Sequence, residues 1–316
     1  MCYLNNIKKK SSIIIIAIII NLSFTSISFS QWASDQWLDE PVSDEIFNTY
    51  LDFFVYEDQL DFKLNIRETS NNDGIYKERI TFQSTVDMDV TADYYRPQGT
   101  STDNNRPHVI VVHGGTPNGK DGMYNRVVKG LIRSGMNVLA IDLLHFGERK
   151  TGLLSSFKND DKARNLYNRK SFYLEWVIQT TKDVSRSVDL LLNHYMASPE
   201  NIAYLGISRG AEMGFIVTGV EKRFSAVALL ISGHFDALET GHLAAACPAN
   251  YVGRIAPTPT FLLNGKYDSD YDSEKSVKPL HKLFNGNTEI HWMDSGHTVS
   301  KDSLQLLQGW LVETLL

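Results

Sequence analysis

The chain has 316 residues, of which 42% are hydrophobic and 22% are charged, which is ordinary for a globular protein. Its 31 Lys and Arg residues against 37 Asp and Glu residues give a formal net charge of −6. This acidic balance lacks the electrostatic pattern of a nucleic-acid-binding protein, and the length allows one large domain or two small ones.

The N-terminus has the pattern of an export signal. Three lysines, Lys8–Lys10, precede the apolar stretch Ile13–Ile20, and small residues follow up to Ser30. This order is typical of a secretory signal peptide, and the stretch is shorter than the ~20 residues of a membrane-spanning helix. We therefore expect residues 1–30 to be a signal peptide cleaved near Ser30, and the protein to be periplasmic or secreted. An uncleaved N-terminal anchor is the alternative. Cleavage would leave Cys247 as the only cysteine, for which we expect a packing role.

Residues 31–74 are expected to form an N-terminal helical extension. The run Ser43-Asp44-Glu45 is typical of a helix start, because small and acidic residues satisfy the free N–H groups there. The helix would pack on a sheet edge, and a lid over the functional site is the alternative. Its apolar stripe is predicted to comprise Ile46, Tyr50, Leu51, Phe54 and Val55.

The rest of the chain, residues 75–316, predicts one catalytic domain of the α/β class. An alternating pattern from Tyr76 to Arg96 indicates two antiparallel strands, and residues 97–107 have loop composition. Short apolar runs then alternate with helical patterns, the longest of which spans about residues 168–194. This alternation predicts a mostly parallel sheet with helices on both faces. The predicted strands are residues 108–113, 137–141, 202–205, 226–231, 260–263 and 289–293.

The strongest motif is the run Gly206-Ile207-Ser208-Arg209-Gly210, which lies between a predicted strand and a predicted helix over residues 211–220. A G-x-S-x-G sequence in that context predicts a nucleophile elbow, a sharp turn that exposes the serine hydroxyl. Gly206 and Gly210 are expected there because side chains two residues from Ser208 would clash with the neighbouring strand and helix.

A serine hydroxyl needs an adjacent base to act as a nucleophile at neutral pH. Two later residues complete such a set in the order serine, acid, histidine. Asp268 follows one predicted strand and His297 follows the last one. We expect His297 to be the base for Ser208, and Asp268 to orient His297. Asp270 and Asp272 are the alternatives for the acid, whereas Asp294 is interpreted as a turn residue and His291 as a strand residue.

A glycine-containing turn, His113-Gly114-Gly115-Thr116, follows the predicted strand 108–113. Backbone N–H groups aimed at a substrate carbonyl oxygen stabilise the negative charge that develops there, and glycines let the backbone come close. We expect one donor of this oxyanion hole to be the N–H of Arg209, and the other to be the N–H of Gly115 or Thr116. His113 is interpreted as a structural residue that holds the turn.

Two further segments belong to the same predicted edge of the sheet. The run Asp142–Arg149 is interpreted as a loop whose ion pair fixes the backbone, with substrate binding as the alternative. The segment 232–259 is the place for a cap near the site. Its small size suggests an open pocket for a modest acyl group such as acetyl.

On these motifs the sequence resembles the dienelactone hydrolase and prolyl-oligopeptidase-like branch of the α/β-hydrolases, which includes acetyl xylan esterase-like enzymes. The matching stretches are VIVVHGG, IDLLHFGER, SPENIAYLGISRGAEMG, TFLLNGKYD and DSGH, within roughly residues 75–316. The resemblance implies the α/β-hydrolase fold and a metal-free hydrolase that acts on esters through Ser208, Asp268 and His297.

Two departures from this branch stand out. Dienelactone hydrolases carry a cysteine where this chain has Ser208, and residues 1–74 leave no room for the β-propeller of prolyl oligopeptidases. The run Ser208–Glu212 also resembles bile-acid acyl-thioesterases, so the resemblance leaves a thioester substrate open.

The residues and the resemblance together predict a serine carboxylic-ester hydrolase that acts on short acyl groups, acetyl among them, through an acyl-enzyme on Ser208. The substrate would be a small-molecule or carbohydrate-linked ester. A serine peptidase and an acyl-thioesterase are the alternatives within the fold, and a non-catalytic binding protein is the alternative outside enzymes. The nine histidines are scattered without an H-E-x-x-H motif, so no metal is expected. The acidic net charge argues against a nucleic-acid partner, and no cofactor is expected. The oligomeric state stays open.

Overall fold

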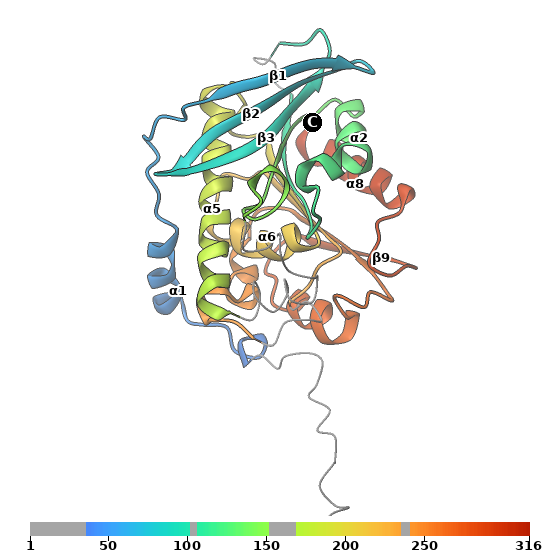
Figure 1. Cartoon of the computed structure of the whole chain (residues 1–316). Coiled ribbons are helices and arrows are strands. Elements are labelled where there is room, and N and C mark those ends of the chain that lie inside the picture. Colours follow the sequence, from blue (N-terminus) through green and yellow to red (C-terminus); the bar gives the residue numbers. More distant parts are fainter. Residues whose placement is uncertain (1–35, 102–105, 152–168, 235–240) are drawn as a thin grey trace, which may run out of the picture. The chain divides into compact units, whose positions relative to one another are not determined.

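The computed structural model of the chain describes residues 36–101, 106–151, 169–234 and 241–316 (Figure 1). The expected signal peptide lies outside these residues, so its cleavage and the export of the protein stay predictions. Within the described ranges, no helix is both long and apolar enough to cross a membrane.

Nine strands form one sheet in the order β1-β2-β3-β5-β4-β6-β7-β8-β9. The pairs from β1 to β5 along this order are antiparallel, and the pairs from β5 to β9 are parallel. The mostly parallel sheet predicted from the sequence is therefore confirmed. The strands are β1 (Asn65–Asn72), β2 (Ile75–Thr85), β3 (Met88–Pro97), β4 (His108–Val112), β5 (Asn137–Ile141), β6 (Ile202–Ile207), β7 (Ala226–Leu230), β8 (Thr260–Gly265) and β9 (Thr288–Met293).

Helices cover both faces of the sheet, which is why every residue of its central strands, β4 to β8, is buried. Along β4, Val109 and Val111 pack with α2 and α8, whereas Ile110 and Val112 belong to the opposite core with α5 and α6. Figure 1 shows α2 beside α8. The helices of four or more residues, in α-helical geometry, are α1 (Asp44–Leu51), α2 (Lys129–Arg133), α5 (Lys170–Asn193), α6 (Arg209–Val220), α7 (Lys278–His281) and α8 (Lys301–Leu315).

Short turns of 3-10 or π-helix connect these elements. The turns η4 and η9 are π-helical and the others are 3-10. Several lie between β7 and β8, where they pack on α5 and α6. The turns are η1 (Gln36–Leu38), η2 (Asp52–Phe54), η3 (Gly119–Met123), η4 (Tyr124–Val128), η5 (Gly147–Arg149), η6 (Ala244–Ala246), η7 (Pro248–Asn250), η8 (Val252–Arg254) and η9 (Ser273–Val277).

The N-terminal helix forms where it was predicted, but the buried residues match the predicted stripe only at Phe54. Ser43 caps α1 by accepting the Ile46 N–H. The buried residues are Phe47 and Phe54, whose rings meet Tyr251 with centroids 5.3 and 6.1 Å apart. Ile46 is 47% exposed and Val55 67%. The predicted stripe is therefore wrong at Ile46 and Val55. The reason is that α1 ends at Leu51 and continues as the 3-10 turn η2, so the α-helical spacing does not extend to Val55. The buried rings of this segment contact Tyr251, whereas the prediction had the helix packing on an edge of the sheet.

Residues 65–72 form a strand that the sequence did not indicate. β1 pairs with β2 in antiparallel register, so the extension expected to be helical over residues 31–74 ends inside the sheet. That expectation is wrong at its C-terminal end. The signal was missing because β1 is an edge strand that is exposed along nearly its whole length. Its polar residues therefore show no alternation of apolar and polar side chains.

We predict that His108 makes folding sensitive to acid. Its Nε2 faces two donors, the Tyr94 hydroxyl at 3.2 Å and the Asn137 amide at 3.1 Å, and burial lowers its pKa to about 4. Between pH 6.5 and pH 4 the unfolded chain therefore binds a proton that the folded chain refuses. The free energy of unfolding should fall with acidification there, by roughly 3 kcal/mol in total from this residue.

Urea unfolding at a series of pH values measures this. The His108→Gln variant, whose amide oxygen can accept the same two donors, should show a shallower loss between pH 6.5 and pH 4. His194→Gln, at an exposed position, is the matched control and should follow the wild type. Parallel curves for wild type and His108→Gln would contradict the prediction.

Candidate active site

Ser208 lies at a strained turn between β6 and α6. Its backbone has φ 52° and ψ −117°, a combination that residues other than glycine rarely adopt. Such strain persists only where the surrounding structure enforces it. A Cβ on Gly206 would lie 2.4 Å from the Gly210 carbonyl oxygen, and one on Gly210 would lie 2.3 Å from the Val112 carbonyl oxygen. Both positions of the motif therefore require glycine for the close approach that was expected.

The structure brings Ser208, His297 and Asp268 into one hydrogen-bonded chain. The His297 Nδ1–H donates to Oδ2 of Asp268 at 2.8 Å, and the Ser208 hydroxyl donates to Nε2 at 2.9 Å. The three residues follow β6, β9 and β8, and the carboxyl ends of parallel strands meet at one edge of a sheet. A Cβ on Gly265 would touch the Gly296 carbonyl oxygen at 2.3 Å, so the end of β8 packs directly on the loop of His297.

Asp268 has the position that an orienting acid needs, and its neighbours do not. It is 5% exposed, and its other oxygen accepts the N–H groups of Asp270 and Tyr271 at 2.8 and 3.1 Å. The Asp270 side chain is half exposed and lies 3.6 Å from Nε2 of His297, on the side of the ring away from Nδ1. Asp272 caps η9 by accepting two backbone N–H groups.

The two remaining rivals also lie apart from this chain of hydrogen bonds. Asp294 is exposed and lies 3.8 Å from the Lys266 ammonium. His291 stacks on Phe261 with ring centroids 4.6 Å apart, on the last strand. Both observations fit the interpretation of Asp294 as a turn residue and of His291 as a strand residue.

The turn after β4 lies against the serine. A Cβ on Gly114 would stand 3.0 Å from Cβ of Ser208. His113 is buried and holds the turn, because its Nδ1–H donates to the Gly114 carbonyl at 2.5 Å and its Nε2 accepts the Leu143 N–H at 3.0 Å. Burial lowers the pKa of His113, which keeps the ring neutral. The Thr116 N–H donates to the Gly114 carbonyl at 2.7 Å, and Gly115 is exposed.

The loop after β5 is an ion-pair cluster around Asp142. The buried Asp142 carboxylate accepts hydrogen bonds from the Lys120 ammonium at 2.8 Å and from the Thr91 hydroxyl at 2.7 Å. Lys120 also donates to Glu148 at 2.5 Å. Burial alone would lower the pKa of Lys120, but the two carboxylates raise it. These contacts support the interpretation of a loop fixed by its ion pair over that of a substrate-binding loop.

A buried network that the sequence did not indicate supports the acid. The Glu212 carboxylate, 1% exposed, pairs with the Arg209 guanidinium and accepts the hydroxyls of Tyr173 and Tyr271, each at 2.5 Å. The Tyr271 N–H in turn donates to Asp268. Glu212 therefore connects the start of α6 with the loop that carries Asp268. The only sequence signal for this network was the run Ser208–Glu212, because the other partners, Tyr173 and Tyr271, are far from it in the sequence.

A cavity of about 720 Å³ opens beside His297, between α2 and α8. None of the described residues that line it is acidic, and Lys129 already pairs with Asp73 at 2.6 Å. A wall with several positive charges attracts anions. The cationic residues that line the cavity are Arg126, Lys129, Arg133 and Lys301.

Comparisons of the sequence with protein-family models and with curated proteins found no match. Solved structures of similar fold include an acetyl xylan esterase from Paenibacillus sp. R4, with 15% identity and a TM-score of 0.67 over 89% of this chain and 99% of that one. Acetyl xylan esterase 1 from Thermoanaerobacterium sp. JW/SL YS485 has 14% identity and a TM-score of 0.62, over 90% and 95%.

A third similar structure is that of a cold-adapted esterase from an Arctic intertidal metagenomic library. Its identity is 18% and its TM-score 0.56, over 79% of this chain and 98% of that one. At these identities the likeness establishes the architecture alone. The chain has the α/β-hydrolase fold, as the resemblance of its motifs implied.

We predict that Glu212→Gln impairs both stability and activity. The neutral amide removes the Glu212 charge that faces the buried Arg209 guanidinium, which should cost roughly 3 kcal/mol in the free energy of unfolding. It also loosens Tyr271 and hence Asp268, so the rate of a reaction through Ser208 and His297 should fall on the order of 10-fold to 100-fold. Urea unfolding and initial rates on p-nitrophenyl acetate measure the two effects.

The matched control is Glu221→Gln, at the other end of α6, where a buried carboxylate pairs with Arg223 at 2.6 Å. This variant should lose stability while it keeps its kcat. An equal kcat in both variants would show that Glu212 does not position Asp268.

Proposed function

We propose that the protein is a serine carboxylic-ester hydrolase. The proposal rests above all on one observation, the hydrogen-bonded chain from the Ser208 hydroxyl through His297 to Asp268. A nucleophile, a base and an orienting acid at these distances are the arrangement that acyl transfer requires. The esterases of similar fold raise the expectation for ester substrates, although fold alone does not fix a reaction.

In the first half-reaction, Oγ of Ser208 attacks the ester carbonyl carbon while Nε2 of His297 takes the hydroxyl proton. Asp268 holds the ring in the tautomer with a proton on Nδ1 and stabilises the imidazolium that forms. The tetrahedral intermediate collapses, the bond to the alcohol oxygen breaks, and His297 gives its proton to the leaving alcohol. The acyl group is then esterified to Ser208.

In the second half-reaction, water replaces the alcohol. His297 takes a proton from the water as the water oxygen attacks the acyl carbon, and it returns a proton to Oγ of Ser208 as that bond breaks. The products are a carboxylic acid and the original serine. The same three residues therefore serve both steps, with no further reactant than water.

Two backbone N–H groups would stabilise the oxyanion in both steps. The first is the N–H of Arg209, which lies in the first turn of α6, where a helix supplies no acceptors of its own. For the second we favour Gly115 over Thr116, because the Thr116 N–H donates to the Gly114 carbonyl. The turn that carries Gly115 lies against Ser208, within reach of a bound carbonyl.

Ester hydrolysis should depend on Ser208 and His297 but not on the nearby His291. Ser208→Ala and His297→Ala should each lower kcat on p-nitrophenyl acetate by ~10⁴-fold or more, because the chain of proton transfer is broken. His291→Ala, at a histidine on β9, the strand that leads to His297, is the matched control and should keep near wild-type activity. A fluorophosphonate probe should label the wild type and not Ser208→Ala. Near wild-type turnover by Ser208→Ala would refute the assignment.

The same assay separates the alternatives. Labelling of Ser208 without cleavage of acetyl, butyryl or longer p-nitrophenyl esters would favour a serine peptidase or an acyl-thioesterase. Silence in both assays would favour a non-catalytic protein on a hydrolase fold.

The positive charge of the cavity beside His297 should affect the choice of substrate. The cavity beside His297 should favour esters whose alcohol part is anionic, because cationic residues line it. The kcat/KM for 4-acetoxybenzoate relative to its neutral methyl ester should fall with added salt, since screening weakens the attraction. Arg126→Gln together with Arg133→Gln should lower that ratio about 5-fold or more. Lys182→Gln, on α5 in the opposite helix layer, is the matched control. A ratio insensitive to salt and to the double substitution would contradict this prediction.

A further inference from the structure

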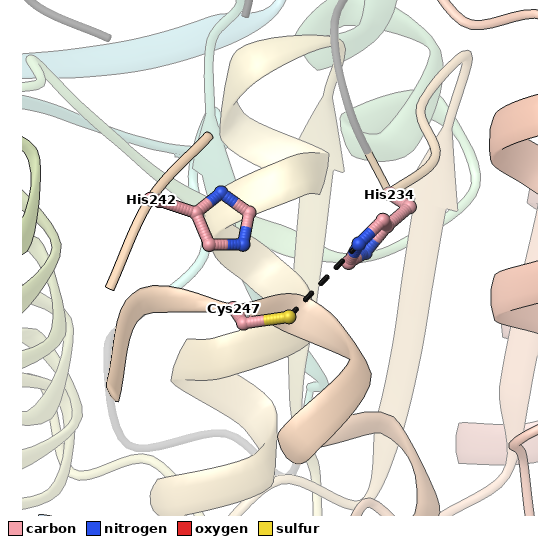
Figure 2. A group of neighbouring side chains, drawn as sticks. All are labelled: His234, His242 and Cys247. Carbon is pink, nitrogen blue, oxygen red and sulfur yellow. Dashed lines mark hydrogen bonds between the residues drawn. The ribbon is translucent and has the colours of Figure 1, made fainter. Parts of the chain in front are cut away.

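Three side chains with metal-ligand chemistry meet outside the chain of Ser208, His297 and Asp268. They are His234, His242 and Cys247, and all three are buried, with exposed fractions of 0%, 5% and 0%. Figure 2 shows the three side chains near one another; His234 lies shortly after β7, and His242 and Cys247 lie on either side of η6. Two imidazoles and a thiol are the donor types that Zn²⁺ prefers.

The separation of the sulfur from one imidazole nitrogen is close to the value that one ion imposes, and the other donor separations lie within 4.8 Å. One ligand atom from each residue can be chosen so that all lie within 4.8 Å of one another. The Cys247 Sγ lies 4.0 Å from Nε2 of His234. Zinc bonds of about 2.0 Å to nitrogen and 2.3 Å to sulfur, at tetrahedral angles, place such donors about 3.6 Å apart. Side-chain shifts of a few tenths of an ångström would bring the sulfur and this nitrogen to that separation.

The backbone holds the three residues near this geometry without help from an ion. On the strand side, the Ser232 N–H donates to the Asn264 side chain at 2.8 Å. On the other side, the Tyr251 hydroxyl donates to the Ala245 carbonyl at 2.7 Å, and the Asn250 N–H donates to the Cys247 carbonyl at 3.1 Å. The ring of His242 is stacked on that of Tyr173, with centroids 6.0 Å apart. Preorganised ligands lose little freedom when an ion binds.

We propose that His234, His242 and Cys247 form a binding site for a single Zn²⁺ ion, with a water molecule as the fourth ligand. On binding, the Cys247 thiol releases its proton to solvent and coordinates as a thiolate, and each imidazole coordinates through a neutral nitrogen. The ion and the thiolate together carry one positive charge. Two imidazoles and a thiolate bind a soft divalent ion far better than Mg²⁺ or Ca²⁺, which prefer oxygen ligands.

The site would act as a clamp within the fold. His234 lies shortly after the end of β7 at Leu230, whereas Cys247 lies between η6 and η7, which pack on α5 and α6. One ion would therefore tie the carboxyl end of a central strand to the helix layer. His242 also stacks on Tyr173, whose hydroxyl donates to Glu212, so the clamp would adjoin the network that supports Asp268. This inference is independent of the ester reaction, because it needs no substrate.

Cobalt substitution tests the site directly. The full-length protein, freed of metal with a chelator, is titrated with Co²⁺. We expect one Co²⁺ per chain, the strong visible bands of four-coordinate cobalt, and a thiolate-to-cobalt charge-transfer band in the near ultraviolet. Zn²⁺ should bleach both sets of bands stoichiometrically and raise the thermal unfolding midpoint by several degrees. A wild-type titration without a charge-transfer band would overturn the proposal.

The two cysteines of the chain supply a matched pair of variants. Cys247→Ser should abolish the charge-transfer band, whereas Cys2→Ser should keep it. His242→Gln should weaken Zn²⁺ affinity at least about 10-fold in competition with a chromophoric chelator, and His194→Gln, at an exposed histidine, should not. A band that survives Cys247→Ser, or one lost in Cys2→Ser, would overturn the assignment. If Cys247→Ser fails to fold, the wild-type spectrum compared with Cys2→Ser still decides it.

Discussion

The turn from β6 into α6 has no room for a side chain at either of its glycines, and this constraint determines where the rest of the site lies. Carbonyl oxygens of the same turn and of β4 lie where a Cβ on Gly206 or Gly210 would stand. The chain can pass only if Ser208 takes a strained positive φ, which turns its side chain away from the sheet. Because β6 pairs with β4 and β7 in parallel, the loops after neighbouring strands open at the same edge.

Buried charges hold those loops in place. Asp142 with Lys120 fixes the loop after β5, and Glu212 with Arg209 links α6 to the loop of Asp268. Burying an ion pair is costly and adds little net stability. Once the pair is buried, however, the removal of one partner is severely destabilising, because the other charge is left without compensation. Such pairs therefore restrict the loops to one arrangement. The precision of the hydrogen bonds at His297 depends on these polar supports as much as on the apolar cores.

Local signals were sufficient for most of the framework. The strands from β4 to β9 are short and bounded by turn residues, and those from β4 to β8 are mostly apolar, so each was predicted within two residues at either end. The elbow was evident because a steric rule ties Ser208 to its glycines. Failures occurred where the signal is not local. The polar edge strand β1 has no alternation, and α1 buries Phe47 because Tyr251 lies opposite, some 200 positions later in the chain.

The sequence by itself determined the alternation of strands and helices from β4 onward, the strained serine, and an acid and a histidine that follow it in order, because each depends on residues close together in the chain or on a fixed order. Only the tertiary structure decided that Asp268 and not Asp270 lies at Nδ1 of His297, since the two differ by two positions and by which side of the ring they reach. It alone joined Glu212 with Tyr173 and Tyr271, and His234 with Cys247. Contacts between distant segments arise from packing, and no local pattern encodes them.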